Sequence, residues 1–395
     1  MRLYKMSKEI AFLSASDRNN YGDLLFPMVF NEYLKKEFPD YTLKNYGMVN
    51  SDLSDYGALE TESYKDLEAL SQRNQDLRLV IGGGEVLFPR WTLLYSYINP
   101  TFGWLFKKSK FFKKLEYKLE FSKKLLSSTN QAFPFTPFFD GVKCFYNSVG
   151  GVDISKLNES EKSIVKKNLD AASLVSVRDE LTQESLESIG INGIKLIPDS
   201  AIVMSDFYPV EKLEKLSFPN VEQLPEKYVM LQLGSRFEPS DLELFIDGLK
   251  NYATNHGCKV VCCPIGLASG HEDDKILKKI CEIEQSFIYI HPENLFDIMY
   301  VIAKAQVYFG TSLHGLITSL SFLTKFVPLN KGVHKMSRYA NTWASKLGTT
   351  KCYEYTGDWD EIEQLTSNWD FDTHQKLLDE QKALVFENFE KFVKG

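Results

Sequence analysis

The sequence predicts an α/β protein of two domains, each with a parallel sheet that is covered by helices on its faces. Short apolar runs rich in β-branched residues alternate with amphipathic stretches of crossover-helix length, which is typical of parallel sheets. The alternation starts again after the polar segment 208–226, and a chain of 395 residues exceeds what one hydrophobic core usually serves. We expect the two domains to face a cleft, because open α/β sheets bind ligands beyond the carboxyl ends of their strands.

The first domain is expected to span residues 1–207. Apolar runs that end in turn residues predict its strands, and amphipathic periodicity predicts its helices. The expected strands are 10–15, 79–81, 142–149, 174–177 and 194–197, and the expected helices are 24–38, 160–171 and 180–189.

The second domain is expected to span residues 208–370, and a C-terminal helix the remaining 371–395. An amphipathic helix with an apolar face must dock on something, and we expect this one to pack back across the domains. The expected strands are 228–233, 259–263, 287–290 and 307–309, the helices 240–254, 272–284 and 293–304, and the apolar face Leu377, Leu378, Leu384, Val385, Phe389 and Phe392.

The composition argues against several partners and locations. The 46 Lys and Arg against 53 Asp and Glu leave a formal charge of −7, which disfavours nucleic acid as the main partner. No apolar stretch reaches the length of a signal peptide core or a membrane span, so we expect a cytoplasmic protein. The six cysteines lack metal-ligand spacing, and a polar helix start explains His271, Asp273 and Asp274 better than a metal site. Reduced thiols are expected, with no metal and no cofactor.

One segment departs from this acidic composition. Between Trp104 and Leu125, in an expected insertion near 102–128, eight lysines stand against two glutamates, a local formal charge of +6. Aromatic residues and leucines are interleaved, as in a basic amphipathic helix on anionic lipid at the inner face of the plasma membrane. An ordinary helix with solvated lysines has the same composition. Both interpretations stay open.

The most informative turn is Gly310-Thr311-Ser312-Leu313-His314-Gly315, which follows an expected strand and precedes a helical spacing of apolar residues. The N–H groups and the positive dipole end of such a helix favour an anion. We therefore expect Ser312, Leu313, His314 and Gly315 to bind a phosphate or carboxylate. In the alternative, Thr311 or Ser312 only caps the helix and His314 packs under a neighbouring loop.

Two turns of the first domain carry glycine and short polar residues. Asn20, Gly22 and Asp23 follow the first strand and suit a sugar hydroxyl or a phosphate, although Asp23 is also a plain candidate for the N-cap of the next helix. The turn Gly82-Gly83-Gly84 exposes the main chain to a ligand. Its spacing matches neither the dinucleotide fingerprint nor the P-loop, so neither NAD nor ATP is predicted.

Two arginines follow strands and are candidate anion ligands. The planar guanidinium of Arg178 suits a carboxylate or a phosphate, and a surface ion pair with Asp179 or Glu180 is the structural alternative. Arg236, after a strand of the second domain, is a comparable candidate. The polar residues expected to complete the rim are Asn147 and Asp199.

Taken together, these motifs resemble those of the polysaccharide pyruvyl transferase family. Many members have Ser-Arg-Leu-His-Gly at the last motif, where this chain has Thr311-Ser312-Leu313-His314-Gly315, so an anion-binding arginine is absent; Arg236 or a lysine compensates, or the donor is held differently. The resemblance rests on the order Asn19-Asn20-Tyr21-Gly22-Asp23, Gly82-Gly83-Gly84, Val177-Arg178-Asp179, Pro198-Asp199 and Ser312-Leu313-His314-Gly315.

The resemblance implies a fold like that of GT-B glycosyltransferases, with two Rossmann-like domains. It also implies transfer of pyruvate from phosphoenolpyruvate to two hydroxyls of a sugar as a ketal, in a bacterial surface-polysaccharide, capsule or cell-wall pathway. The expected partners are phosphoenolpyruvate and a sugar acceptor, for which a polyprenyl-diphosphate link is one form. Two alternatives stay open: a GT-B-type nucleotide-sugar glycosyltransferase and a non-catalytic, membrane-associated scaffold.

The implied reaction needs a general acid and a general base. We expect His314 to be the acid, because an adjacent phosphate dianion favours the protonated imidazole, and Asp23 to be the base. A role for His314 as a phosphate ligand alone stays open.

Overall fold

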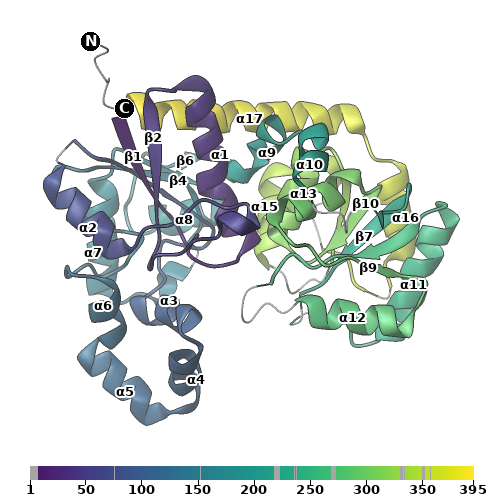
Figure 1. Cartoon of the computed structure of the whole chain (residues 1–395), viewed down its shortest axis with the longest axis horizontal. Coiled ribbons are helices and arrows are strands. Elements are labelled where there is room, and N and C mark those ends of the chain that lie inside the picture. The colour runs from purple at the N-terminus through teal and green to yellow at the C-terminus, as the bar shows by residue number, and fades with distance from the viewer. Residues whose placement is uncertain are drawn as a thin grey trace. The chain divides into compact units, whose positions relative to one another are not determined.

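The computed structural model describes residues 8–395 except 75, 152, 218–222, 235, 237, 268–272, 330–331, 333, 349–351 and 356. The chain divides into two compact units, the first of Met1–Ser54, Ala58–Ser200 and Phe386–Gly395, the second of Asp55–Gly57 and Ala201–Val385 (Figure 1).

Residues 201–207, expected in the first domain, belong to the second unit. Ser321 of that unit donates a hydrogen bond to the carbonyl oxygen of Ile202 at 2.7 Å and accepts one from the N–H of Ser205 at 3.2 Å. Local sequence patterns cannot predict hydrogen bonds between residues so far apart in the chain.

The first unit contains a six-stranded sheet in the order β2-β1-β3-β4-β5-β6, with every strand parallel to its neighbours. Helices follow the strands as the alternation predicts. The strands are β1 (Lys8–Leu13), β2 (Tyr41–Tyr46), β3 (Arg78–Gly82), β4 (Lys143–Val149), β5 (Leu174–Val177) and β6 (Lys195–Leu196), and the helices are α1 (Tyr21–Glu37), α2 (Tyr64–Arg73), α3 (Trp91–Ile98), α4 (Pro100–Lys108), α5 (Lys110–Leu119), α6 (Phe121–Leu126), α7 (Glu159–Asp170) and α8 (Glu180–Glu187).

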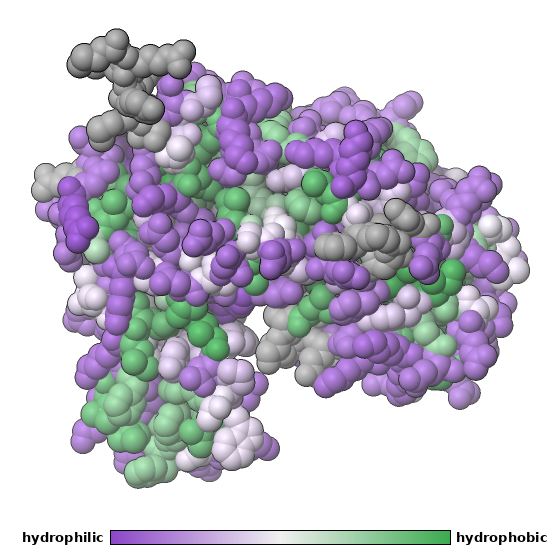
Figure 2. All heavy atoms as spheres, in the orientation of Figure 1, coloured by the Kyte–Doolittle hydropathy of each residue, from purple (hydrophilic) through white to green (hydrophobic). Residues whose placement is uncertain are grey.

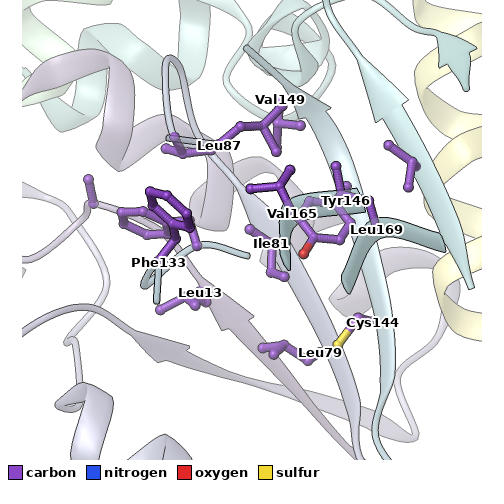
Figure 3. Packing of buried hydrophobic residues seen from close by; sticks show 14 of the residues in the cluster. Leu13, Leu79, Ile81, Leu87, Phe133, Cys144, Tyr146, Val149, Val165 and Leu169 are labelled. Carbon is purple, nitrogen blue, oxygen red and sulfur yellow. The ribbon is translucent and has the colours of Figure 1, made fainter. Parts of the chain in front are cut away.

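Alternating side chains of the first sheet serve two hydrophobic layers, because successive residues of a strand point to opposite faces. On one face, Leu13 and Ile81 belong to a buried cluster with Val165 and Leu169 of α7 (Figure 3). On the opposite face, Phe12 packs 5.8 Å from Phe30 of α1, measured between ring centroids.

The second unit contains a five-stranded parallel sheet in the order β11-β10-β7-β8-β9. One face packs on α11 and α12 through a cluster that includes Leu231, Phe245 and Leu277. The strands are β7 (Tyr228–Gln232), β8 (Lys259–Cys262), β9 (Ile288–Tyr289), β10 (Val307–Gly310) and β11 (Lys325–Pro328), and the helices are α9 (Met204–Phe207), α10 (Val210–Leu216), α11 (Leu242–Asn255), α12 (Asp273–Ile283), α13 (Leu295–Lys304), α14 (Leu313–Ser321), α15 (His334–Trp343), α16 (Trp359–Ser367) and α17 (Phe371–Lys394).

The basic segment forms three short helices, α4 to α6, rather than the single amphipathic helix expected. Ser109 ends α4 and caps α5 by accepting a hydrogen bond from the N–H of Phe112 at 3.1 Å. Glu120, with φ of 50°, turns the chain between α5 and α6. Caps of this kind redirect the backbone without interrupting the basic composition.

The C-terminal helix α17 contributes to both units. Residues up to Val385 belong to the second unit, and the final ten residues belong to the first. Within the first unit, the ring of Phe389 lies 4.9 Å from that of Phe30 and 5.2 Å from that of Tyr33. The apolar face that the periodicity predicts is therefore buried against α1 at this end.

Candidate functional site

Arg178 follows β5 directly and is a buried, ion-paired side chain. It is 2% exposed; Nη1 donates to Asp199 and Nη2 to Glu85, both at 3.2 Å. Burial alone would lower the pKa of the guanidinium, but the carboxylates of Glu85 and Asp199 outweigh it, so the pKa is raised. Asp179, a partner considered from the sequence, instead caps α8.

The charge of this cluster bears on donor binding. One guanidinium beside two carboxylates leaves a net negative group, so the positive charge of Arg178 is already compensated within the protein. An anionic donor at Arg178 would have to compete with Glu85 and Asp199. Its role as a substrate ligand stays a prediction.

The glycine turn after β3 is shaped by contacts within the first unit. A Cβ atom at Gly82 would lie 2.5 Å from the ring of Phe12, and Gly83 has φ of +136°, a backbone conformation that side chains rarely adopt. The carbonyl oxygen of Gly84 accepts a hydrogen bond from the N–H of Gly150 at 2.7 Å. Glycine is thus required here by the fold itself, and ligand access at Gly82, Gly83 and Gly84 stays a prediction.

Asn20 and Asp23 lie together at the start of α1. The helix begins at Tyr21, so Asp23 is in its first turn and the expectation that Asp23 is the N-cap is wrong; Asn20 holds that position. The side-chain amide of Asn20 donates a hydrogen bond to the carboxylate of Asp23 at 2.8 Å. Gly22, which precedes Asp23, is buried. Asp23 remains partly exposed, and its role as a base stays a prediction.

Asn147 and Asp199 are fully buried and bonded within the first unit. Asn147 lies inside β4, within the strand that the sequence predicts over 142–149. Its amide donates to Ser200 at 3.0 Å, while Asp199 accepts from Arg178. The structure therefore explains both residues as internal partners.

The turn before α14 in the second unit is organised by Gln232, a buried residue at the end of β7. Its Oε1 accepts hydrogen bonds from the N–H groups of Thr311 at 3.1 Å and Ser312 at 3.0 Å, and from the hydroxyl of Tyr308 at 3.0 Å. Its Nε2 donates to Asp273 at 2.8 Å. One amide therefore joins the carboxyl ends of β7 and β10 to the start of α12.

Tyr308 explains two glycines of the same turn. A Cβ atom at Gly310 would lie 2.1 Å from the Tyr308 hydroxyl oxygen, and one at Gly315 would lie 2.0 Å from it. Real Cβ contacts are never this short, so the hydroxyl reaches Gln232 only because both positions are glycine.

Asp273 is a buried residue and the first of α12, in agreement with the polar helix start that the sequence predicts. Burial raises its pKa to about 6, although hydrogen bonds from the N–H of Gly266 at 2.8 Å and from Gln232 favour the ionised form. His271, weighed with it as a metal ligand, lies outside the described residues.

His314 lies in the first turn of α14, next to a cap that the sequence anticipated. Ser312 accepts a hydrogen bond from the N–H of Gly315 at 3.3 Å and is therefore the N-cap of α14, while anion binding at this turn stays a prediction. The N–H groups of Thr311, Ser312 and Gly315 thus have partners within the protein, and an anion at this terminus would use other donors. Leu313 is buried, whereas His314 is partly exposed.

Arg236 belongs to the loop after β7, and this loop is tied to the α14 turn. The N–H of Gly234 donates to Thr311 at 2.9 Å, and Arg236 itself is exposed. Arg236 lies two residues beyond that bond and therefore near the carboxyl edge of the second sheet. Its participation in donor binding stays a prediction.

Sequence reasoning missed Gln232, Tyr308 and Glu85. The available signal at Gln232 was a polar residue at the end of an otherwise apolar strand, Tyr228–Gln232. Another missed residue is Asp17, which accepts hydrogen bonds from the N–H groups of Met48 at 2.7 Å and Val49 at 3.3 Å. Nothing local distinguished Asp17 from the neighbouring polar residues.

The two units define a GT-B-type protein, and solved structures share this fold. The UDP-GlcNAc 2-epimerase from Methanocaldococcus jannaschii is similar with a TM-score of 0.60 and 9% identity, covering 98% of this chain and 100% of that one. The UDP-N-acetylglucosamine 2-epimerase from Rickettsia bellii is similar with a TM-score of 0.55 and 9% identity, covering 98% and 96%. At such identities the likeness shows the fold alone.

The sequence profile of the family described as "Polysaccharide pyruvyl transferase" matches residues 20–330, most of the chain. The protein belongs to this family, as the ordered motifs predicted, and the family is one of transferases. No curated protein matches the chain significantly. Among the residues that the structure describes, no helix is long and apolar enough to cross a membrane.

Proposed function

We propose that this protein transfers pyruvate from phosphoenolpyruvate to two hydroxyls of a sugar in a surface polysaccharide or its lipid-linked precursor. The observation that carries the proposal is the family match over residues 20–330. A partly exposed histidine and an exposed arginine near the carboxyl edge of the second sheet support it, since the donor carries a phosphate and a carboxylate. No cofactor is required by this chemistry.

The proposed reaction balances as follows. A proton is added to the methylene carbon of phosphoenolpyruvate, and one sugar hydroxyl attacks the neighbouring carbon and loses its proton. The bond to phosphate then breaks, and the second hydroxyl closes the ketal and loses its proton. Of the two protons released, one replaces the proton used at the methylene carbon and the other leaves with phosphate.

His314 is the proposed acid and Asp23 the proposed base. Arg236, together with donors of the α14 terminus, is the proposed replacement for the family arginine that is absent at Ser312. Arg178 is the proposed ligand of an anionic group of the donor, in exchange for part of its pairing with Glu85 and Asp199.

A donor comparison tests the proposal. Phosphoenolpyruvate at one hundred times its Kd is expected to stabilise the protein by about 2.7 kcal/mol in a thermal unfolding assay, while UDP-sugars have no effect. Stabilisation by a UDP-sugar alone would favour the glycosyltransferase alternative. Mass spectrometry of the surface glycan, in cells with and without the gene, should then detect a pyruvate ketal only when the gene is present.

Replacing His314 tests its role in turnover. His314→Gln should lower phosphate release from phosphoenolpyruvate in the presence of acceptor by at least ~100-fold, the typical contribution of a general acid, with unchanged unfolding. The matched control is His334→Gln, an exposed histidine at the start of α15. Near wild-type turnover of His314→Gln would remove this residue from the chemistry.

A further inference from the structure

The insertion between β3 and β4, residues 91–126, carries an unusual concentration of exposed apolar side chains. Figure 1 shows its helices α4 and α5 lying away from the sheet of the first unit, and Figure 2 shows hydrophobic residues gathered over them. Among the described residues, fourteen large hydrophobic side chains are exposed, and half of them are in this insertion: Leu93, Tyr97, Trp104, Phe111, Tyr117, Phe121 and Leu125.

The insertion has an aromatic core of its own around Phe102, whose ring lies 4.8 Å from Tyr95 and 5.3 Å from Phe112. Of the exposed side chains, Tyr117 touches the edge of this core, with its ring 5.9 Å from that of Phe106. At the base of the insertion, Trp91 is buried and its ring lies 4.9 Å from that of Tyr64 in α2. The insertion is therefore anchored to the first unit while a second set of aromatic residues stays in solvent.

The exposed face of α5 combines both kinds of residue. Lys110, Lys114 and Lys118 are spaced four residues apart and lie on one side of the helix, flanked by Phe111 and Tyr117. Phe111 is 77% exposed and Tyr117 is 64% exposed. Aromatic rings beside lysines are the composition that favours the boundary between lipid headgroups and acyl chains.

The exposed charge of the insertion is mostly positive. Of its two glutamates between 104 and 125, Glu116 is buried and accepts hydrogen bonds from Ser122, so it offers no negative charge at the surface. Only Glu120 is exposed against six exposed lysines, Lys107, Lys108, Lys110, Lys114, Lys118 and Lys124.

We propose that this insertion docks on an anionic lipid bilayer, with the lysines at the headgroups and Trp104, Phe111 and Tyr117 in the interface. The charge complementarity selects anionic lipid as the occupant, because a protein of net charge −7 is otherwise repelled by such a surface. The proposal is independent of the transfer reaction above. It concerns a surface of the first unit alone.

Sedimentation with vesicles of equal parts phosphatidylglycerol and phosphatidylcholine tests the proposal with the full chain. The wild type should bind these vesicles, release them as salt is raised, and ignore vesicles of phosphatidylcholine alone. The triple variant Lys110→Gln, Lys114→Gln, Lys118→Gln should bind about 100-fold more weakly, since each lysine near an anionic surface contributes about a tenfold factor or less.

A matched control separates this surface from general charge effects. Lys65→Gln, Lys304→Gln and Lys376→Gln remove three exposed lysines elsewhere and should leave binding within about threefold of the wild type. A second variant, Phe111→Ser with Tyr117→Ser, should also weaken binding, because apolar burial adds to charge attraction. Trp104 emission should shift to the blue with vesicles, measured as the difference between wild type and Trp104→Phe.

Three results would overturn the proposal. They are equal binding by the wild type and the lysine triple variant, no binding of anionic vesicles by the wild type, and concentration-dependent self-association that the same variants abolish without any vesicle binding. The last result would assign the surface to a second copy of the chain.

Discussion

Gln232 shows how much of the candidate site depends on one neutral side chain. Its carbonyl oxygen accepts three hydrogen bonds at the α14 turn, and its amide nitrogen donates to Asp273. A carboxamide is the only common side chain that offers both functions at this size. The turn between β10 and α14, which contains His314, is therefore fixed by hydrogen bonds to a residue of the neighbouring strand β7.

Gln232→Glu should destabilise the protein in a pH-dependent way. The new carboxylate would face Asp273, whose pKa is already raised to about 6, so one of the pair must stay protonated. An acid whose pKa is higher in the folded than in the unfolded protein stabilises the fold at low pH. This contribution is lost as the pH rises through the pKa of the folded state. We expect a loss of ~3 kcal/mol at pH 8 and much less at pH 5, measured by urea unfolding.

The double variant Gln232→Glu with Asp273→Asn is the control, because it restores one donor and one acceptor between the two side chains. Most of the lost stability at pH 8 should return. A loss that is independent of pH, or that the second substitution does not repair, would contradict the role assigned to this pair.

Arg178→Lys should also be costly, although the charge is conserved. A lysine ammonium cannot bridge the exposed Glu85 and the buried Asp199 as the planar guanidinium does, so at least one of these two ion pairs is lost. We expect the free energy of unfolding to fall by ~2–3 kcal/mol. In the control Arg90→Lys, at an exposed arginine paired with Glu161, the change should stay within ~0.5 kcal/mol.

At the scale of elements, α17 contains a buried histidine that makes stability depend on pH. The Nε2 of His374 donates to the carbonyl oxygen of Leu320 at 3.1 Å, and its Nδ1 accepts from Trp369 at 3.3 Å. Burial lowers its pKa to about 4, with the Leu320 bond acting weakly in the opposite direction. At pH values between about 4 and 6.5, the imidazole of His374 is therefore neutral in the folded protein and protonated in the unfolded chain.

His374→Gln should reduce the loss of stability on acidification. Between pH 6.5 and pH 4 the unfolded chain binds a proton that the folded one does not, which lowers the free energy of unfolding by as much as ~3 kcal/mol as the pH falls. The variant lacks this titration, so its unfolding free energies at pH 7 and pH 4.5 should differ by ~2 kcal/mol less than those of the wild type.

The raised pKa of Asp273 acts with the opposite sign in this window but is present in both proteins, so it cancels in the comparison. The exposed His334→Gln is the matched control and should leave the pH dependence unchanged. An unaltered pH profile in His374→Gln would contradict this account.

At the scale of the whole molecule, the last residues of the chain complete a unit that begins with the first strand. Phe389 and Phe392 are fully buried, and the ring of Phe392 lies 5.6 Å from that of Phe145 in β4. The face of the first sheet that packs on α1 is therefore also covered by residues of α17, more than two hundred positions after β4.

Phe389→Ala should destabilise the first unit by ~3–5 kcal/mol, because it leaves a cavity beside Phe30 and Tyr33. Hydrogen exchange should accelerate in β1 and β4 and stay unchanged in β7 and β10. Phe371→Ala, at an exposed position of the same helix, is the control and should change neither set. Equal acceleration in both sheets after Phe389→Ala would contradict the assignment of these residues to the first unit.

All the central strands were predicted, as were the edge strands β6 and β9, but two other edge strands were not. β4 and β7 are buried along most of their length, and each contains a run of at least three apolar residues. The missed strands, β2 and β11, lie at the edges of their sheets. β2 alternates between half-buried and exposed residues over 41–44 before it ends in two buried residues, and β11 contains a lysine and a proline, so neither has the apolar run of a central strand.

The alternation of strands and helices, the turns after the strands and the family could be inferred from residue order alone, because they depend on neighbouring residues and on short motifs. Which polar groups pair with one another became known only from the three-dimensional fold. Arg178 and Glu85 are 93 residues apart, and Gln232 lies 80 residues from Ser312. Such partners meet only because parallel strands bring distant turns to the same edge of a sheet.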